Sequence, residues 1–309
     1  PMTEPTLTPP ARRGPGTEVI SFGSIFLEIV FGHLDKLPRP GEEIYVDPFA
    51  FSCGGAITIA VGASRAGALA GLATVLGDDL GSRLVVEQSI REGVDLSASQ
   101  RVSGPVAGIT VVFNFNGDRA FVSHMPPLSP DVVPEIERWP EILRQERPAW
   151  CYLHANDRVA DFLPEARALG TRVALDLNFG SIDRYPDAVV ECARLADLFL
   201  PNEEELLRLT RLEDLGEAMT LAASWCPRVV VKRGRAGAIA VEDGKPTQVT
   251  AGLEDVVAMD RTGAGDAFAG AMIGSLVRGA GLLEAVVAGN SAGSRAVARL
   301  GAVGEMPVS

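Results

Sequence analysis

The stretch Asp260-Arg261-Thr262-Gly263-Ala264-Gly265-Asp266-Ala267-Phe268 decides how the rest of this sequence is interpreted. Small and apolar residues recur after it at helical spacing, from Phe268 to Leu276, so the glycines are predicted to lie at the start of a helix. The first backbone N–H groups of a helix have no partner within it, and glycines allow a ligand to approach closely. The stretch therefore predicts an anion hole suited to a phosphate in transfer.

Asp266 is predicted to stand at the edge of this anion hole, where the helix dipole stabilises an ionised carboxylate. Such a group is placed to accept a proton from an attacking hydroxyl. Phosphoryl transfer needs in-line positioning, stabilisation of charge and a group that orients the nucleophile, and this stretch supplies the last two. The alternative is a turn with a capping aspartate, because short glycine motifs also occur where nothing binds.

Outside this stretch, short β-branched segments alternate with helical patterns from Val19 onward, which is typical of βαβ units in a parallel sheet. Two segments, at about 43–52 and 108–123, break the alternation, and Asn116-Gly117-Asp118 has the composition of a hairpin turn. We therefore predict an α/β fold in which a small accessory sheet covers a site at the carboxyl ends of the strands.

This pattern predicts one domain at residues 18–309, with both accessory segments inserted in it, preceded by a proline-rich disordered tail at residues 1–17. The predicted strands are 18–22, 73–76, 149–153, 172–177, 198–200, 228–232 and 238–241, and the predicted helices include 80–92, 157–169, 203–210 and 215–225.

The composition excludes several kinds of partner. A net charge of −12 repels phosphate backbones, and no Lys/Arg cluster with interleaved aromatics overrides it, so nucleic acid is not an expected partner. The apolar stretches are interrupted by charged residues and rich in glycine, and no apolar signal segment precedes residue 18, so we predict a cytoplasmic protein without a membrane span. The cysteines are interpreted as reduced thiols because they form neither a CxxC pair nor a metal-ligand pattern with the histidines: Cys53, Cys151, Cys192 and Cys226.

The stretch at residues 260–268, together with further motifs in matching order along almost the whole chain, resembles the sequence pattern of the ribokinase-like, or PfkB, carbohydrate kinases. Their signature near the C-terminus reads Asp-Thr-x-Gly-Ala-Gly-Asp before an apolar helix, and Arg261 is a departure outside its core. The resemblance implies a mostly parallel sheet with helices on both faces and a small β-sheet lid, through which two subunits pair as a homodimer. It also implies ATP-dependent phosphorylation of a hydroxyl of a small sugar or sugar-like substrate.

The same resemblance assigns roles to individual residues. Asp266 is the catalytic base, and Gly263, Ala264 and Gly265 form the anion hole. The cofactors implied are ATP and Mg²⁺, with K⁺ in potassium-activated relatives, where Asp260 and Thr262 correspond to residues beside a monovalent cation. The remaining implied contacts are the sugar-binding pair Gly54 and Gly55; Asn202 and Glu205 near magnesium, Glu205 acting through water; the nucleotide loop residues Lys232, Gly234 and Gly237; and Asn290 on the adenine side.

Several of these residues also have a purely structural interpretation. Asn202 and Glu205 have the spacing of a helix capping box, which is compatible with a role at the metal. The glycines at 234 and 237 allow a tight turn whether or not a nucleotide binds, and Asn290 is equally interpreted as a hydrogen-bonding partner of a neighbouring helix.

Three residues on the substrate side depart from the family pattern. Glu28 stands where relatives have a sugar-binding Asp, and Thr58 stands where an Asn commonly follows the two glycines. Thr offers fewer donors and acceptors than an amide, so these changes argue against ribose itself. His154 ends a predicted strand close to a sugar-contacting position of some relatives, or else is a histidine with a structural partner.

Three functions remain open at this point. The first is a sugar kinase, with a nucleoside kinase of the same family as its variant. The second is a sugar-binding or regulatory homologue that has lost activity through its altered pocket. The third is a Rossmann dinucleotide enzyme, which ranks last because no G-x-G-x-x-G follows the first strand with an acidic residue about twenty positions on.

Overall fold

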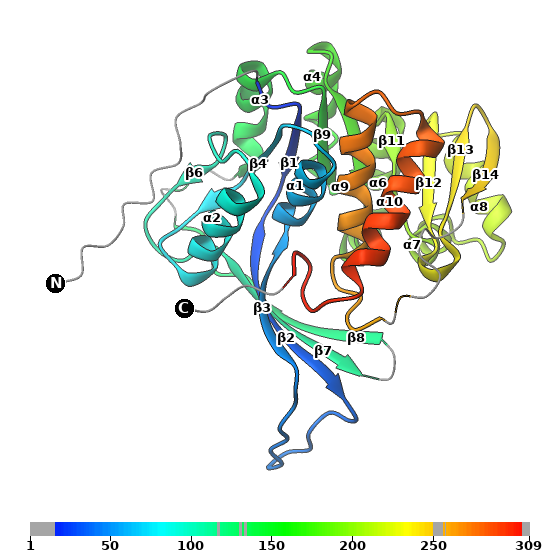
Figure 1. The fold of residues 1–309 in the computed structure, drawn as a ribbon. Coiled ribbons are helices and arrows are strands. Elements are labelled where there is room, and N and C mark those ends of the chain that lie inside the picture. The colour runs from blue at the N-terminus through cyan, green and yellow to red at the C-terminus, as the bar shows by residue number, and fades with distance from the viewer. Residues whose placement is uncertain are drawn as a thin grey trace.

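An eight-stranded sheet in the order β14-β13-β12-β11-β10-β9-β1-β4 forms the centre of the molecule (Figure 1). The strands from β12 to β4 run parallel, and β13 and β14 complete one edge in antiparallel fashion. The computed structural model describes residues 16–115, 118–129, 132, 135–249, 256 and 258–304, so most of the predicted tail and two residues of the predicted hairpin turn lie outside the described part. The strands are β1 (Val19–Phe22), β4 (Ala70–Ala73), β9 (Trp150–His154), β10 (Arg172–Asp176), β11 (Leu198–Phe199), β12 (Arg228–Lys232), β13 (Ala238–Glu242) and β14 (Lys245–Val249).

Helices cover both faces of this sheet, as Figure 1 shows. In β9, Cys151 and Leu153 pack into the core on one face, and Trp150 and Tyr152 pack into the core on the other. This alternation follows from the two-residue period of a strand, and burial on both faces is the usual environment of a parallel sheet. The helices are α1 (Ala56–Arg65), α9 (Ala264–Val277) and α10 (Leu282–Ala296) on one face; α3 (Glu135–Glu146), α4 (Leu163–Ala168), α5 (Phe179–Arg184), α6 (Pro186–Leu195), α7 (Glu203–Thr210) and α8 (Leu215–Ala223) on the other; and α2 (Leu80–Glu92) at the edge.

A second sheet, in the order β3-β2-β7-β8, projects from the body below the central sheet in Figure 1. We call it the lid sheet. Sequence patterning predicts no strand at residues 25–34, yet these residues form its longest strand, and residues 43–48 lie in no strand. Only Gly23 and Ser24 separate this strand from β1. The sequence pattern therefore does not distinguish two separate strands there. Its strands are β2 (Ile25–Leu34), β3 (Phe49–Gly55), β7 (Gly108–Phe115) and β8 (Asp118–His124).

Most predicted elements agree with the observed ones, and one helix is shorter for a clear reason. The helices 80–92 and 203–210 have the predicted bounds, and the helix predicted from 215 ends at Ala223. The helix predicted at 157–169 begins only at Leu163, with Pro164 in its first turn. Proline lacks the N–H that a helix interior requires, so a helix starting at 157 would have been broken there.

Helices α1 and α9 approach each other more closely than ordinary side chains allow. A Cβ atom on Gly270 would lie 2.4 Å from the carbonyl oxygen of Ile59, and one on Gly274 would lie 2.8 Å from the carbonyl oxygen of Ala63. The two backbones are therefore in direct contact, which requires glycine at these positions. Among the described residues, no helix combines the length and apolar character needed to cross a bilayer.

Candidate active site

The glycine-rich stretch at residues 260–268 lies at the start of α9, as predicted. Gly263 is the N-cap residue with φ 70°, a left-handed conformation that glycine adopts without strain. A Cβ atom there would lie 2.3 Å from Cβ of Ala302, so the turn also packs too tightly for a side chain. Gly265 is exposed and Asp266 is partly exposed in the first turn. The helix therefore presents N–H groups and a carboxylate together at an accessible end.

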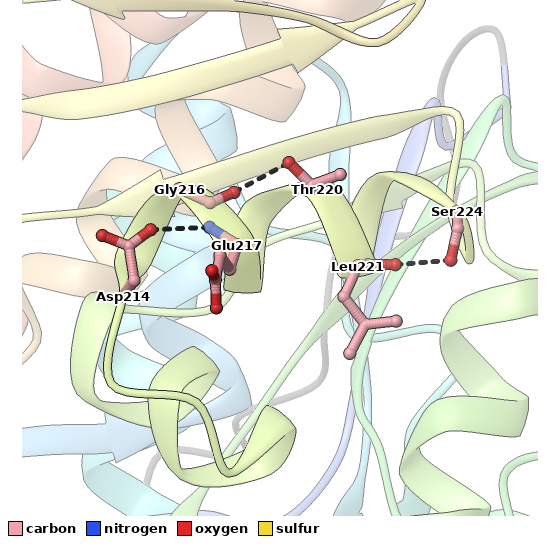
Figure 2. Close-up of a pocket in the computed structure, with 6 residues that line it drawn as sticks. All are labelled: Asp214, Gly216, Glu217, Thr220, Leu221 and Ser224. Carbon is pink, nitrogen blue, oxygen red and sulfur yellow. Dashed lines mark hydrogen bonds between the residues drawn. The ribbon is translucent and has the colours of Figure 1, made fainter.

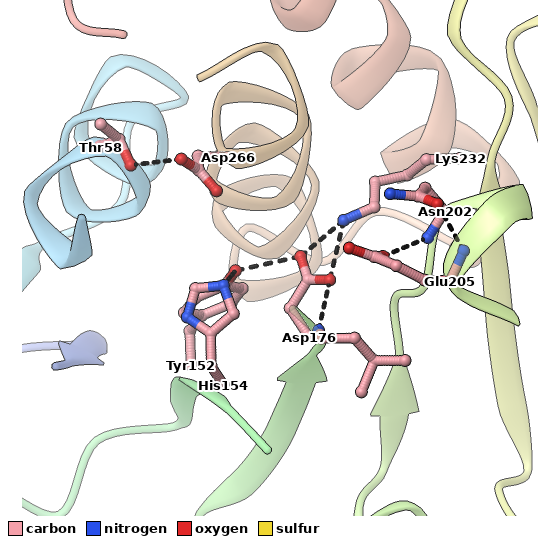
Figure 3. Close-up of polar contacts among 9 residues, drawn as sticks. Thr58, Tyr152, His154, Asp176, Asn202, Glu205, Lys232 and Asp266 are labelled. Atoms are coloured by element: carbon pink, nitrogen blue, oxygen red, sulfur yellow. Dashed lines mark hydrogen bonds and ion pairs between the residues drawn. The ribbon is translucent and has the colours of Figure 1, made fainter. Parts of the chain in front are cut away.

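Asp266 contacts Thr58, which α1 brings to the same place (Figure 3). Oγ1 of Thr58 lies 3.0 Å from Oδ2 of Asp266 and 2.6 Å from the carbonyl oxygen of Gly55. Burial raises the pKa of Asp266 above its ordinary value, and the charge of Asp176 adds to this, whereas His154 and Lys232 lower it. The hydroxyl of Thr58 has one proton for these two acceptors, and its donation to Asp266 lowers the pKa of that carboxyl group and so favours the ionised form.

An ion pair lies beside Asp266 at the carboxyl ends of β10 and β12. Nζ of Lys232 is 2.6 and 2.8 Å from the two carboxylate oxygens of Asp176; the Asp176 side chain is buried and that of Lys232 is 14% exposed. The hydroxyl of Tyr152 donates to Asp176 at 3.0 Å. Figure 3 shows these side chains pointing toward one another; Tyr152 comes from β9, next to β10, and Lys232 comes from β12, with β11 between it and β10. Burial opposes the charged form of Lys232, but Asp176 and Glu205 outweigh it and raise the lysine pKa, so the ammonium stays charged.

Lys232 also lies next to the predicted anion hole. A Cβ atom on Gly265 would be 3.7 Å from its Nζ atom, so the ammonium is within reach of any anion bound at the start of α9. Sequence reasoning predicted Lys232 but did not assign Tyr152 or Asp176 to the site. The signal that marks them is the polar residue at a strand end: Asp176 closes β10, in register with His154 of β9.

Asn202 and Glu205 form the predicted capping box at the start of α7. The side chain of Asn202 accepts from the N–H of Glu205 at 2.8 Å, and the side chain of Glu205 accepts from the N–H of Asn202 at 2.8 Å. Burial raises the pKa of Glu205 to about 7, with Lys232 lowering and Asp176 raising it. A nearby cation would lower the pKa of this carboxyl group and favour its ionised form. Glu205 therefore suits a position beside a hydrated metal ion.

Glu28 lies on β2 of the lid sheet, near enough to Asp266 and Asp260 for their charges to act on it. Only 7% of it is exposed, and Oε2 accepts from the N–H of Ala302 at 3.3 Å. Burial raises its pKa to about 8; the Ala302 hydrogen bond lowers it, and the charges of Asp266 and Asp260 raise it. A Cβ atom on Gly54 would lie 2.2 Å from Oε1 of Glu28, so the glycine makes room for the longer carboxylate.

Asp260 and Thr262 lie in the buried turn that precedes α9. One oxygen of Asp260 accepts from the N–H and the hydroxyl of Thr262, at 2.9 and 2.7 Å, and the other accepts from the N–H of Gly301 at 2.9 Å. These donors are all neutral, so they tie the turn to the C-terminal segment without balancing the charge of Asp260.

The remaining predicted residues lie at the edges of this cluster. His154 is partly exposed at the end of β9, with its ring edge-on to Tyr152. Gly234 and Gly237 flank the short turn between β12 and β13. Asn290 of α10 is buried and donates to the carbonyl oxygen of Val249 at 3.2 Å, so it has a structural partner, on strand β14 and not on the neighbouring helix that the alternative interpretation expected.

A wide hollow over α8 is not part of this site. All of its lining residues belong to that helix and its two ends, and their polar groups are bonded locally, as Figure 2 shows. Asp214 caps the N–H of Glu217 at 2.8 Å, and Thr220 donates to the carbonyl oxygen of Gly216 at 2.8 Å. Satisfied groups on one helix do not converge on a ligand, so we assign no function to this surface.

The fold and the cluster together are those of an enzyme that handles phosphate groups: a parallel sheet, a lid sheet and a glycine-rich helix start at the carboxyl ends of the strands. The family model described as "pfkB family carbohydrate kinase" matches residues 17–308, and the chain therefore belongs to this family. It is a kinase, a phosphotransferase with an alcohol group as acceptor.

Individual relatives agree with this assignment. The chain is 28% identical to the cytidine kinase of Thermococcus kodakarensis over 272 residues, which cover 84% of this chain and 91% of the relative. The solved structure of an adenosine kinase from Sinorhizobium meliloti has a TM-score of 0.77 and 22% identity, covering 93% of this chain and 95% of its own. A solved structure from E. coli that contains ATP and Mg²⁺ has a TM-score of 0.76 and 23% identity, covering 93% and 94% of the two chains.

Proposed function

We propose that this kinase transfers the terminal phosphoryl group of ATP to a hydroxyl of a small sugar or sugar-like substrate, with Asp266 as base and the backbone of Gly263, Ala264 and Gly265 as anion hole. The observation that carries this proposal is the position of Asp266. Asp266, a partly exposed residue, lies in the first turn of α9 with its carboxyl group in contact with Thr58, while the ammonium of Lys232 lies close to Gly265.

In the proposed reaction the acceptor oxygen forms a bond to the γ-phosphorus as the bond from that phosphorus to the β,γ-bridging oxygen breaks, and ADP leaves. The acceptor proton passes to Asp266, whose pKa burial raises and so makes the carboxylate a stronger base. Lys232 and the N–H groups at the start of α9 stabilise the charge on the transferred group. Asp176 and Tyr152 hold Lys232 in position.

The proposed nucleotide side comprises Lys232, Gly234, Gly237 and Asn290, together with Asn202 and Glu205. That a protein of the same fold contains ATP and Mg²⁺ supports these two cofactors here. Glu205 would hold hydrated Mg²⁺, because its buried carboxylate has a pKa of about 7 and gains from a cation. Magnesium, when bound, neutralises charge on the nucleotide phosphates.

The proposed substrate side comprises Glu28, Gly54, Gly55, Thr58 and His154. At neutral pH Glu28 is mostly protonated, since its pKa is raised to about 8, so its carboxyl group can donate as well as accept a hydrogen bond. A nucleoside is the second candidate acceptor, favoured by the similarity to a cytidine kinase over 84% of the chain.

Measurement of ADP release tests activity and acceptor together. The wild-type enzyme, with ATP, Mg²⁺ and K⁺, is offered pentoses, hexoses, keto-deoxy acids and nucleosides, and the Asp266→Asn variant is the matched control. Release that depends on both an acceptor and Asp266 supports the proposal. Tight acceptor binding without turnover would instead identify a silent sugar-binding homologue, and turnover that survives in Asp266→Asn would refute the role of the base.

We also propose a monovalent cation beside Asp260 and Thr262. Its support is the buried carboxylate of Asp260, which is 2% exposed and whose hydrogen bonds within the described part of the chain all come from neutral donors, an arrangement that a nearby cation would stabilise. Replacing K⁺ by choline at constant ionic strength should lower turnover, and equal rates in the two salts would contradict the proposal.

Pairing of two subunits through the lid sheet is a further part of this proposal. Phe121 and Val122 on the edge strand β8 are 50% and 64% exposed, and apolar side chains on an edge strand favour contact with another chain. Light scattering should give a dimer mass for the wild-type protein and a monomer mass for Val122→Glu. A wild-type monomer would exclude the dimer.

A further inference from the structure

A groove crosses the outer face of the layer formed by α1, α9 and α10, which lie side by side in Figure 1. It encloses about 340 Å³. Helix α9 forms its floor through Ala267, Ala271 and Ser275, and α1 and α10 form its walls. One end reaches Thr58, but the polar side chains of the proposed nucleotide side do not line it. The groove is therefore distinct from the proposed nucleotide side, and Thr58 is its one lining residue among those of the proposed substrate side.

Three arginines converge on this groove from different parts of the chain: Arg65 of α1, Arg295 of α10 and Arg299 just after α10. Arg65 pairs with Glu92 through two contacts of 2.9 and 2.5 Å and donates to the carbonyl oxygen of Val303 at 3.1 Å. The guanidinium groups of Arg295 and Arg299 make no hydrogen bond or ion pair with any residue that the structure describes, and Arg299 is bonded only through its backbone N–H, to Ala296. Two guanidinium groups at the groove are thus available to an anion.

The charges at the groove are unbalanced. Partial burial lowers the pKa of Arg299, and the charges of Arg65 and Arg295 lower it further, with only Glu92 opposing them among its main influences. Glu92 is already shared between Arg65 and Gln88, which donates to it at 2.9 Å. In a chain with a net charge of −12, three arginines around one carboxylate form a local excess of positive charge.

Isolated arginines on a protein surface commonly need no explanation, since they remain hydrated there. This set differs because its members converge on a concave surface, and because gathering like charges is unfavourable unless an anion offsets it. A planar guanidinium group matches the oxygens of a phosphate in two parallel hydrogen bonds. A volume of about 340 Å³ is at the small end for ligand pockets, which suits a short phosphate ester better than a nucleotide.

We propose that this groove binds a small phosphorylated molecule, with its phosphate at Arg295 and Arg299 and its carbon skeleton along the floor of small residues on α9. The small residues on the floor of the groove are the reason why we expect a phosphate ester to bind more tightly than free phosphate. Ala267, Ala271 and the neighbouring Ala292 leave room for a short aliphatic chain, whereas larger residues would fill the groove.

Isothermal titration calorimetry tests the proposal with three probes: inorganic phosphate, glycerol 3-phosphate and sulfate. The full-length protein is first saturated with Mg²⁺ and a non-hydrolysable ATP analogue, so that the proposed phosphate position at the start of α9 is filled. We expect glycerol 3-phosphate to bind with a stoichiometry of one and more tightly than either inorganic ion. The double variant Arg295→Gln/Arg299→Gln should bind it at least tenfold more weakly.

Two further variants separate the charge from the floor. Arg194→Gln removes an exposed arginine on α6, on the other face of the central sheet, and should leave binding unchanged. Ala292→Leu should weaken glycerol 3-phosphate and leave inorganic phosphate unaffected. The proposal is overturned if the double variant binds glycerol 3-phosphate as tightly as the wild type, if the wild type does not bind it, or if all three probes bind equally, which would mean an adventitious ion only.

Discussion

Replacing Glu28 by glutamine should remove a pH dependence from the stability of this kinase. The pKa of Glu28 is raised from 4.5 to about 8 in the folded protein, first of all because the side chain is buried. In the unfolded chain the same group ionises near its ordinary value. The stabilising effect of its protonated form is therefore complete below about pH 4.5 and is lost as the pH rises through about 8. Glutamine resembles the protonated form at every pH.

The size of the effect follows from this difference. A change in pKa from 4.5 to about 8 corresponds to roughly 5 kcal/mol at most, and relaxation around the ionised carboxylate reduces it, so we expect a loss of about 2–4 kcal/mol between pH 4.5 and 8.5. Urea unfolding at a series of pH values measures the free energy of unfolding of the wild type and of Glu28→Gln. The gap between them should grow in favour of the variant as the pH rises.

A matched control is Glu87→Gln on α2, because Glu87 is exposed and its replacement should give a pH profile parallel to that of the wild type. Parallel profiles for Glu28→Gln as well would refute the reasoning, since Glu28 would then ionise in the folded protein as it does in the unfolded chain.

Further substitutions test the rest of the site. Asp266→Asn should lower kcat by about 10²–10⁴-fold with nucleotide affinity unchanged, as measured by steady-state kinetics and nucleotide titration; a smaller loss would contradict proton transfer to this group. Lys232→Met should cost about 3–5 kcal/mol in urea unfolding because it leaves the buried Asp176 unpaired, and adding Asp176→Leu should restore much of the loss. Gly263→Ala should abolish turnover, since the added Cβ would meet the C-terminal segment at 2.3 Å. Its control Gly279→Ala, at φ 93° with no atom within 4 Å of the added Cβ, should cost only backbone strain and retain turnover.

The parts of the fold that were predictable from sequence depend on local signals. The capping box of Asn202 and Glu205 and the glycine cap at Gly93 belong to helices whose predicted bounds agree with the observed ones. The glycines before Asp266 likewise predicted a helix start. In each case the interacting residues are neighbours along the chain, so a short stretch of sequence contains all the groups that determine the local structure.

The parts that were not predictable depend on contacts between distant segments. Tyr152 and Lys232 meet at Asp176 from positions 24 and 56 residues away, and the parallel pairing of β9 with β10, and of β10 with β12 through β11, brings them together. Glu28 and Ala302, 274 residues apart, are joined by one hydrogen bond. The strand β2 escaped prediction because its partners in the lid sheet are set by pairing across the chain, which periodicity does not encode.

The glycine contacts between α1 and α9 constrain how this enzyme can move. Thr58 lies on α1 and Asp266 on α9. The backbones of these two helices are in contact at Gly270 and Gly274, with no side chain between them. Sliding or separation of the two helices would break that contact, so we expect Thr58 and the proposed base Asp266 to move together as one rigid unit. A closure over the proposed site would therefore take place by movement of the lid sheet relative to α1 and α9, and substitutions in the lid sheet would change the proposed acceptor preference while the spacing between Thr58 and Asp266 stays fixed.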